Sequence, residues 1–123
     1  MATVRYMVKD VHAAVTFYTE QLDFTVKQQF GPNMAILAHD GLTLWVAGPN
    51  ASASRPMPDG RKPEPGGWNR FVLEVKNLAD VVERLRKAGT PFRNEIVEGP
   101  GGKQILAEDP SGNVIELFEP ARS

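Results

Sequence analysis

Two stretches of the chain space their apolar residues three and four positions apart, as one face of an amphipathic helix does. The first stretch follows Asp10 and contains Val11, Ala14, Val15, Tyr18 and Leu22. The second follows Asn77 and contains Leu78, Val81, Val82 and Leu85. Asp10 and Asn77 are suited to begin a helix, because their side chains can accept hydrogen bonds from the unpaired N–H groups of the first turn. We therefore predict helices at 11–22 and 78–88.

Shorter apolar segments, bounded by turn residues, predict eight strands. They lie at 3–8, 24–29, 34–39 and 42–47 in the first half of the chain, and at 69–75, 92–97, 103–108 and 113–119 in the second. The halves repeat each other, because the letters ILAHDG at 36–41 return as ILAED at 105–109. Each half has the order strand, helix and three strands, so the predicted fold class is α+β with two βαβββ repeats.

A segment rich in Gly and Pro, at 48–67, separates the two repeats and cannot form regular structure along its length. We expect a single domain over residues 1–123, with repeat one at 1–47, this loop at 48–67 and repeat two at 68–123. The loop is longer than a plain connection requires. Two interpretations of it stay open, a solvated linker or a lid over a binding site.

Composition excludes several classes of function. The 14 Lys and Arg residues nearly balance 15 Asp and Glu, and the net charge of −1 argues against a nucleic-acid partner. No apolar run approaches the roughly 18 residues of a membrane span, so no membrane partner is expected. The first residues lack the apolar core of a secretion signal, which predicts a cytoplasmic protein. With no Cys and two His, the chain offers neither thiol chemistry nor a histidine-rich metal site.

The repeat and two motifs resemble the vicinal oxygen chelate superfamily, which includes glyoxalase I, extradiol dioxygenases, fosfomycin-resistance enzymes and bleomycin-resistance proteins. The motifs are Asp10-Val11 followed by Phe17-Tyr18, and the letters EDPSGNVIEL at 108–117. The resemblance covers nearly the whole chain outside 48–67. It implies that the eight strands curve into an open cup with the two helices outside. It also implies a small-molecule ligand and pairing of chains as a homodimer.

Metal-dependent members of that superfamily take ligands from the first and last strands of each repeat. Carried onto this sequence, those positions are Thr3, Trp45, Arg70 and Glu116. Only Glu116 is an ordinary metal ligand, since Trp offers no lone pair and Arg is a cation without an acceptor. We therefore expect no metal and no other cofactor. A metal-dependent glyoxalase or dioxygenase fits the sequence least.

Side chains alternate along a strand, so residues two positions from these four face the same way. The ligand-binding set that we expect inside the cup consists of Thr3, Arg5, Trp45, Trp68, Gln104 and Phe118, beside Arg70 and Glu116. We favour a metal-independent small-molecule-binding protein, with a cleft lined by Trp45, Arg70 and Glu116. The alternative is an isomerase, lyase or hydrolase, in which Glu116 is the general base and Arg70 stabilises an oxyanion. A third interpretation makes Arg70 and Glu116 a structural salt bridge.

Overall fold

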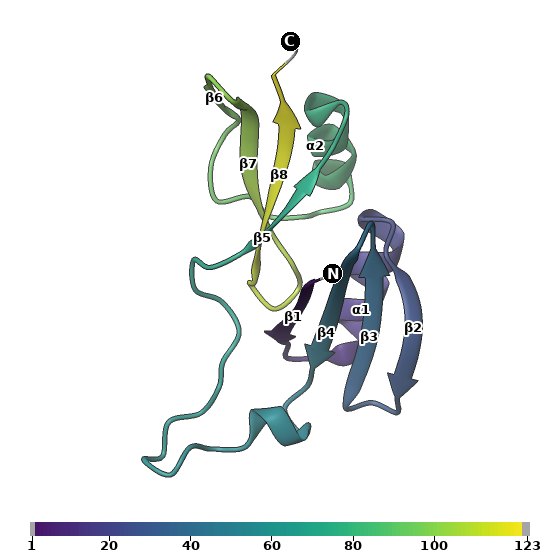
Figure 1. The fold of residues 1–123 in the computed structure, drawn as a ribbon, viewed down its shortest axis with the longest axis vertical. Helices are drawn as coiled ribbons and strands as arrows, with labels where there is room; N and C mark the ends of the chain where they lie inside the picture. The colour runs from purple at the N-terminus through teal and green to yellow at the C-terminus, as the bar shows by residue number, and fades with distance from the viewer. Residues whose placement is uncertain (1, 122–123) are drawn as a thin grey trace. The chain divides into compact units, whose positions relative to one another are not determined.

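A computed structural model of the chain describes residues 2–121. These residues form two α-helices and eight β-strands, in two four-stranded sheets that are not closed into a barrel (Figure 1). The predicted α+β fold of two βαβββ repeats is confirmed. Two compact units can be distinguished: unit 1 holds the described residues up to Gly66 together with 110–113, and unit 2 holds the rest. Neither helix has the length and apolar character needed to cross a membrane.

Unit 1 consists of β1 (Ala2–Met7), α1 (Val11–Gln21), β2 (Thr25–Phe30), β3 (Met34–His39) and β4 (Leu42–Ala47). Its strand order is β1-β4-β3-β2, with β1 parallel to β4 and the other neighbours antiparallel. Helix α1 packs against one face of this sheet (Figure 1). The fully buried side chains there include Tyr18, Leu37 and Leu44. The other sheet face is therefore the one on which a binding site can form.

A helix cap and a hairpin turn in unit 1 form where the sequence predicts them. The Asp10 carboxylate accepts hydrogen bonds from the backbone N–H groups of His12 (2.9 Å) and Ala13 (3.3 Å), which begins α1 at the expected residue. Between β3 and β4, Asp40 and Gly41 have φ values of 42° and 81°. This left-handed pair belongs to the tight hairpin turns that an Asp-Gly sequence favours.

Unit 2 consists of β5 (Phe71–Glu74), α2 (Leu78–Lys87), β6 (Val97–Gly99), β7 (Gly102–Glu108) and β8 (Val114–Pro120). Its strand order is β5-β8-β7-β6, with β5 parallel to β8. Helix α2 buries Leu78 and Leu85, and the sheet buries Ile105, Ile115 and Leu117. The second unit thus repeats the plan of the first, with one covered sheet face.

Two strand predictions in unit 2 need correction. The strand expected at 92–97 begins only at Val97, and Phe92 makes an isolated bridge with Ala107. The side-chain oxygen of Asn94 accepts the Leu106 N–H at 3.0 Å, which takes that donor away from the backbone ladder. The strand expected from residue 69 begins at Phe71, so Arg70 lies just before β5.

The loop at 48–67 forms one short 3-10 turn, η1 (Ser52–Ser54), and is otherwise irregular (Figure 1). Near its start, the Ser54 hydroxyl donates to the Gly48 carbonyl at 2.7 Å. At its other end, the Gly66 N–H donates to the side-chain oxygen of Asn113 at 2.8 Å. The expected absence of regular structure is thus confirmed for most of the segment, and both of its ends are fixed within unit 1.

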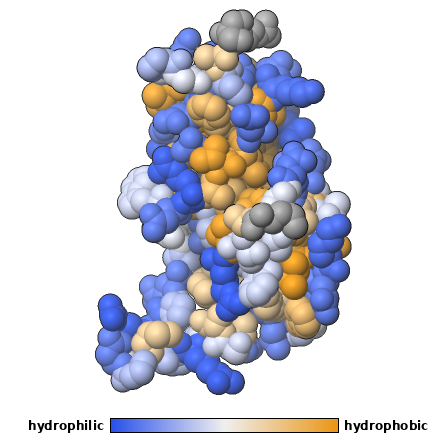
Figure 2. Space-filling model, in the orientation of Figure 1, coloured by the Kyte–Doolittle hydropathy of each residue, from blue (hydrophilic) through white to orange (hydrophobic). Residues whose placement is uncertain are grey.

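Apolar side chains also remain at the surface, and on the face seen in Figure 2 they gather over the strands of unit 2. The exposed apolar residues include Val26 and Phe30 in β2, Val72 in β5 and Val97 in β6. Each of these strands lies at the end of its sheet. Four of the seven large exposed apolar residues among those described thus lie on edge strands, which keep unpaired backbone groups.

Candidate functional site

The sheet face of unit 2 that is turned away from α2 carries predicted residues of the second repeat. Along β8, Ile115 and Leu117 are fully buried on the helix side. Glu116 and Phe118 alternate with them and so lie on the other face. Gln104 of β7 is directly opposite Phe118, and therefore shares that face. The structure brings these three predicted residues together.

Arg70 and Glu116 form an ion pair at this face. The Arg70 Nε and Nη2 groups donate to the same carboxylate oxygen, Oε1 of Glu116, at 3.0 and 2.9 Å. The side chain of Glu116 is 11% exposed and that of Arg70 is 30% exposed. The third guanidinium nitrogen of Arg70, Nη1, donates to the Trp68 carbonyl at 3.4 Å. The contact between Arg70 and Glu116 that the sequence suggested is therefore present, and it extends to Trp68.

A second Arg–Glu pair lies in unit 2, and sequence reasoning missed it. Arg93 Nε donates to Oε2 of Glu108 at 2.7 Å, and Arg93 Nη1 donates to the Gly67 carbonyl at 2.7 Å. The guanidinium carbon of Arg93 is also 4.5 Å from the ring centroid of Trp68. Two arginines thus contact adjacent parts of the segment that leads into β5.

Strand alternation could have identified Glu108, because it lies four residues after Gln104 on the same strand and faces the same way. Strand alternation does not identify Arg93 in this way. Its backbone N–H bonds to the Leu106 carbonyl at 2.9 Å, but the regular ladder is interrupted at Asn94. The side that Arg93 faces therefore depends on a tertiary feature that periodicity does not reveal.

Unit 1 holds the predicted residues of the first repeat. The strand register pairs Thr3 with Thr43 and Arg5 with Trp45. The guanidinium carbon of Arg5 lies 4.9 Å from the Trp45 ring centroid, which is a cation–π distance. Leu44, which alternates with Trp45 along β4, is fully buried on the side of α1. Thr3, Arg5 and Trp45 therefore share the open face of this sheet.

A hollow of about 740 Å³ lies along the same face of unit 1. Of the residues that line it, Ile36 is paired with Trp45 and Thr43 is paired with Thr3. Lys27 adds a charged side chain. Asp23 and Asp40 also line the hollow, and Ile36, Ala38 and Leu42 are its apolar residues. The hollow adjoins the part of unit 1 in which the sequence places ligand contacts.

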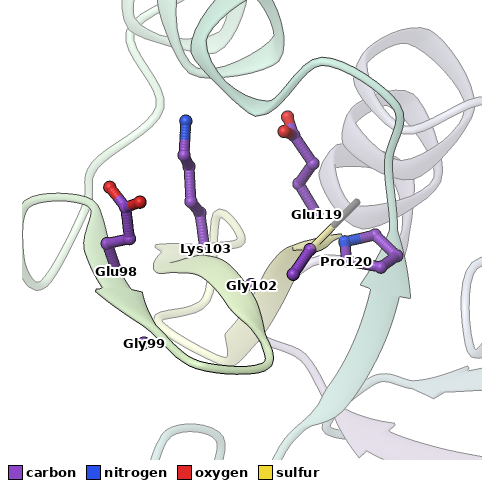
Figure 3. Close-up of a pocket in the computed structure, with 7 residues that line it drawn as sticks. Glu98, Gly99, Gly102, Lys103, Glu119 and Pro120 are labelled. Atoms are coloured by element: carbon purple, nitrogen blue, oxygen red, sulfur yellow. The ribbon is translucent and has the colours of Figure 1, made fainter. Parts of the chain in front are cut away.

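A pocket of about 320 Å³ at the turn between β6 and β7 contains none of the predicted site residues. Lys103 pairs with Glu98 on one side and Glu119 on the other, and the three side chains extend in the same direction (Figure 3). Glu119 accepts the Leu78 N–H at 2.7 Å, at the first residue of α2. This carboxylate therefore helps to begin a helix.

The residues at the four family ligand positions do not fit a divalent metal ion. Glu116 is the one carboxylate among them, and its Oε1 is held by the Arg70 cation. Trp45 offers no donor atom and lies beside Arg5. Across residues 2–121, His, Asp and Glu side chains nowhere gather in a group of three that could hold a metal.

Several solved structures share this fold. A lactoylglutathione lyase from Agrobacterium tumefaciens is 17% identical, with a TM-score of 0.75 over 97% of this chain and 92% of that chain. A member of the glyoxalase/bleomycin resistance protein/dioxygenase superfamily from Sphaerobacter thermophilus is 24% identical, with a TM-score of 0.75 over 97% and 95%. TnmS3, an antibiotic binding protein from a Streptomyces species, is 23% identical, with a TM-score of 0.71 over 97% and 93%. At these identities the similarity concerns the fold alone.

A search of curated proteins found no match. The model of one protein family, described as the Glyoxalase/Bleomycin resistance protein/Dioxygenase superfamily, matches residues 1–117. Because that match spans both βαβββ units, and because solved structures of the same superfamily share the fold, the chain belongs to the glyoxalase/bleomycin resistance protein/dioxygenase superfamily.

Proposed function

We propose that the protein binds a small organic molecule without a metal ion, through the open sheet faces that carry Trp45, Arg70 and Glu116. Thr3, Arg5, Trp68, Gln104 and Phe118 contribute further contacts in this proposal. The ligand has an apolar part that suits the tryptophans, and a polar or acidic group that suits the arginines.

The pairing of Arg70 with Glu116 is the observation that carries this proposal. Both hydrogen bonds from Arg70 go to one oxygen of a carboxylate that is 11% exposed. A carboxylate held by a cation in this way is a poor ligand for a second cation. The same oxygen already accepts two hydrogen bonds, so it is poorly placed to take a proton from a substrate. Binding is therefore favoured over both metal chemistry and proton abstraction.

Proteins of similar fold include a binding protein and an enzyme. TnmS3 is described as an antibiotic binding protein, and the Agrobacterium protein as a lactoylglutathione lyase. Our proposal likens this chain to the binding protein, because the residues at its family ligand positions do not suit a metal ion.

The test is a thermal-shift screen of a fragment library against the purified protein, once in EDTA and once with added Zn²⁺, Ni²⁺ or Mn²⁺. A ligand at about 100 times its Kd stabilises the folded state by about 2.7 kcal/mol, so a specific ligand gives a clear shift. We expect the same ligands to be found under both conditions. Elemental analysis is expected to find far less than one transition-metal ion per chain.

Two outcomes contradict this proposal. Nearly one Zn, Ni, Mn or Fe per chain, lost in the Glu116→Ala variant, would support a metalloenzyme. Conversion of a bound fragment, followed by NMR and abolished by Glu116→Gln, would support the isomerase, lyase or hydrolase.

A cytoplasmic location and a homodimeric state are part of the same proposal. The chain contains no Cys, so its folding does not depend on an oxidising compartment. Cell fractionation tests the location, and light scattering tests the dimer.

A further inference from the structure

Trp68 is the most exposed of the large apolar residues in the described part of the chain. It is 67% exposed, although an indole of this size usually packs against other side chains. It lies in the segment that leads from the 48–67 loop into β5. An exposed ring in such a segment is useful for binding only if its orientation is fixed, because ordering it during binding would cost affinity.

Two arginines bond to the backbone of this segment, at Gly67 and at Trp68. Arg93 donates to the carbonyl of Gly67 at 2.7 Å and lies 4.5 Å from the Trp68 ring centroid. Arg70 donates to the carbonyl of Trp68 itself at 3.4 Å. The backbone on either side of the indole and the indole itself are therefore held by cations.

Glu108 in turn holds Arg93. The Arg93 Nε donates to Glu108 Oε2 at 2.7 Å, and the two side chains are 18% and 28% exposed. Limited solvent exposure strengthens this ion pair. Arg86 makes a similar set of contacts with Phe92 (5.4 Å) and Glu95 (3.0 Å), but its ion pair is 49% and 86% exposed. The ion pair of Arg93 is thus less exposed to solvent than that of Arg86.

We propose that Trp68 stacks on a planar aromatic acid whose carboxylate or phenolate contacts Arg70, and that Arg93, held by Glu108, is the positioning residue for Trp68. This rests on the proposed small-molecule function. One face of the indole is turned to Arg93, and the large exposed area of the ring provides a surface for stacking. In its bonds with the described residues, Arg70 uses one donor on each nitrogen, and a guanidinium has five donors. Its remaining donors suit an anionic oxygen.

The ligand class is tested by calorimetry on the whole protein with three probes of similar size. They are 2-naphthoate, which is planar and acidic, 2-naphthamide, which is planar and neutral, and decahydro-2-naphthoate, which is acidic but not planar. We expect 2-naphthoate to bind about tenfold more tightly than either of the others, because only it can both stack and pair with a guanidinium. Equal affinity for the three probes, or no binding of any, overturns the ligand class. Fragments found in the thermal-shift screen would then still support the proposed function.

The role of Arg93 is tested by Arg93→Lys, with Arg86→Lys as the matched control. Lys keeps the charge but cannot bind a carboxylate and a carbonyl through a rigid fork. We expect Arg93→Lys to weaken 2-naphthoate binding about tenfold, and Arg86→Lys to change it less than twofold. Glu108→Gln, which keeps the shape of the side chain but removes its charge, is expected to weaken binding in the same direction. Equal affinities for the Arg93→Lys and Arg86→Lys variants overturn the positioning role.

A direct measurement of the ring separates positioning from a merely structural effect. The chain has two Trp residues, so Trp68 is the only one in a Trp45→Phe background. In that background, time-resolved fluorescence anisotropy is expected to show faster local motion of Trp68 after Arg93→Lys and no change after Arg86→Lys. Unchanged motion of the indole after Arg93→Lys contradicts the proposal, whatever happens to stability.

Discussion

At the scale of single residues, we expect the Arg70 guanidinium to stabilise the buried Glu116 carboxylate. Removing it by Arg70→Met leaves a carboxylate that is only 11% exposed, without its cation. Exposed ion pairs contribute about 0–1 kcal/mol, and breaking a fully buried pair costs about 3–5 kcal/mol. For this intermediate case we expect a loss of about 2 kcal/mol in urea denaturation. Adding Glu116→Gln should recover more than half of it.

Arg86→Met provides the control for this cycle, because the Arg86–Glu95 pair is mostly exposed. We expect it to cost less than about 0.5 kcal/mol. If Arg70→Met costs no more than Arg86→Met, then Glu116 does not depend on its partner for stability. The pair would in that case matter for a ligand alone.

Gly102 is a second residue with a strict local requirement. It has a φ of 145°, and a Cβ atom placed on it would collide with the backbone oxygen of Glu119 on the neighbouring strand. We expect Gly102→Ala to destabilise the protein by about 3 kcal/mol, measured by thermal and urea unfolding. A Cβ atom on Gly101 would point into open space, so Gly101→Ala should stay within about 0.5 kcal/mol of wild type. Similar stabilities for the two variants would show that β7 and β8 can separate locally without cost.

Single residues also show which contacts the sequence could predict and which it could not. Arg70 and Glu116 were found because the repeat aligns them with family positions, and their contact is confirmed. The sequence could not show that Arg93 stacks on Trp68, since the two are 25 positions apart (68 and 93) and meet only in the folded unit. The contact between Arg5 and Trp45 follows from strand register, which hydrophobic periodicity alone leaves undetermined.

At the scale of elements, the turn at 110–113 has a structural reason for its sequence. The Asn113 side chain donates to the Met7 carbonyl at 2.7 Å and accepts the Gly66 N–H at 2.8 Å. The Ser111 hydroxyl accepts the Lys9 N–H at 2.8 Å. A side-chain amide can donate and accept at once, so Asn113 can bond both groups. The motif letters SGN thus include the residues that hold the end of β1.

The substitution that tests this device is Asn113→Asp. A carboxylate still accepts from Gly66, but it faces the Met7 carbonyl with no proton to donate. Because Asn113 is buried, we expect a loss of about 3 kcal/mol in urea denaturation. Asn50→Asp, at an exposed position, should change stability by less than about 0.5 kcal/mol. A loss no larger than that of the Asn50 variant would show that water enters and bonds the Met7 carbonyl.

Helices and most strands could be predicted because local signals agreed with the packing. Helix α1 begins after its capping Asp10 and α2 after Asn77, and both end one residue before the predicted boundary. The strands at 34–39 and 42–47 match in full, since an Asp-Gly turn fixes their register. The prediction of a strand at 92–97 was wrong because the Asn94 side chain competes with the backbone for the Leu106 N–H. Strand propensity does not take such competition into account.

At the scale of the whole molecule, the two units repeat one plan with different chemistry. Each open sheet face carries an Arg–Trp contact, Arg5 with Trp45 in unit 1 and Arg93 with Trp68 in unit 2. Only unit 2 adds Glu108 and Glu116 to its arginines. The two contacts occupy different positions of the repeat, because Trp45 corresponds to Glu116 and not to Trp68. The two units therefore share the sheet, while the side chains on its open face differ. We assign the acidic end of a ligand to Arg70 in unit 2 because three of its five donors are used in bonds with the described residues, and the others suit an anionic oxygen.

The association of whole chains is the remaining property that the surface allows us to anticipate. Val26 and Phe30 on β2, Val72 on β5 and Val97 on β6 leave apolar area on strands that end their sheets. Edge strands of this kind pair with other chains unless they are covered or charged. We expect a homodimer, with a mass of about 27 kDa by light scattering at micromolar concentration, twice the 13.5 kDa of one chain.

Charged substitutions on the edge strands show which of them forms the dimer. A Lys at position 30 or 72 puts a cation on an edge strand, and at least one of Phe30→Lys and Val72→Lys should lower the mass to that of a single chain. Thr16→Lys is the control, since Thr16 is exposed on α1 rather than on a strand. Circular dichroism establishes that each variant is folded before its mass is measured. A wild-type mass of 13.5 kDa would mean that the edge strands stay unpaired in solution, and that each chain binds its ligand alone.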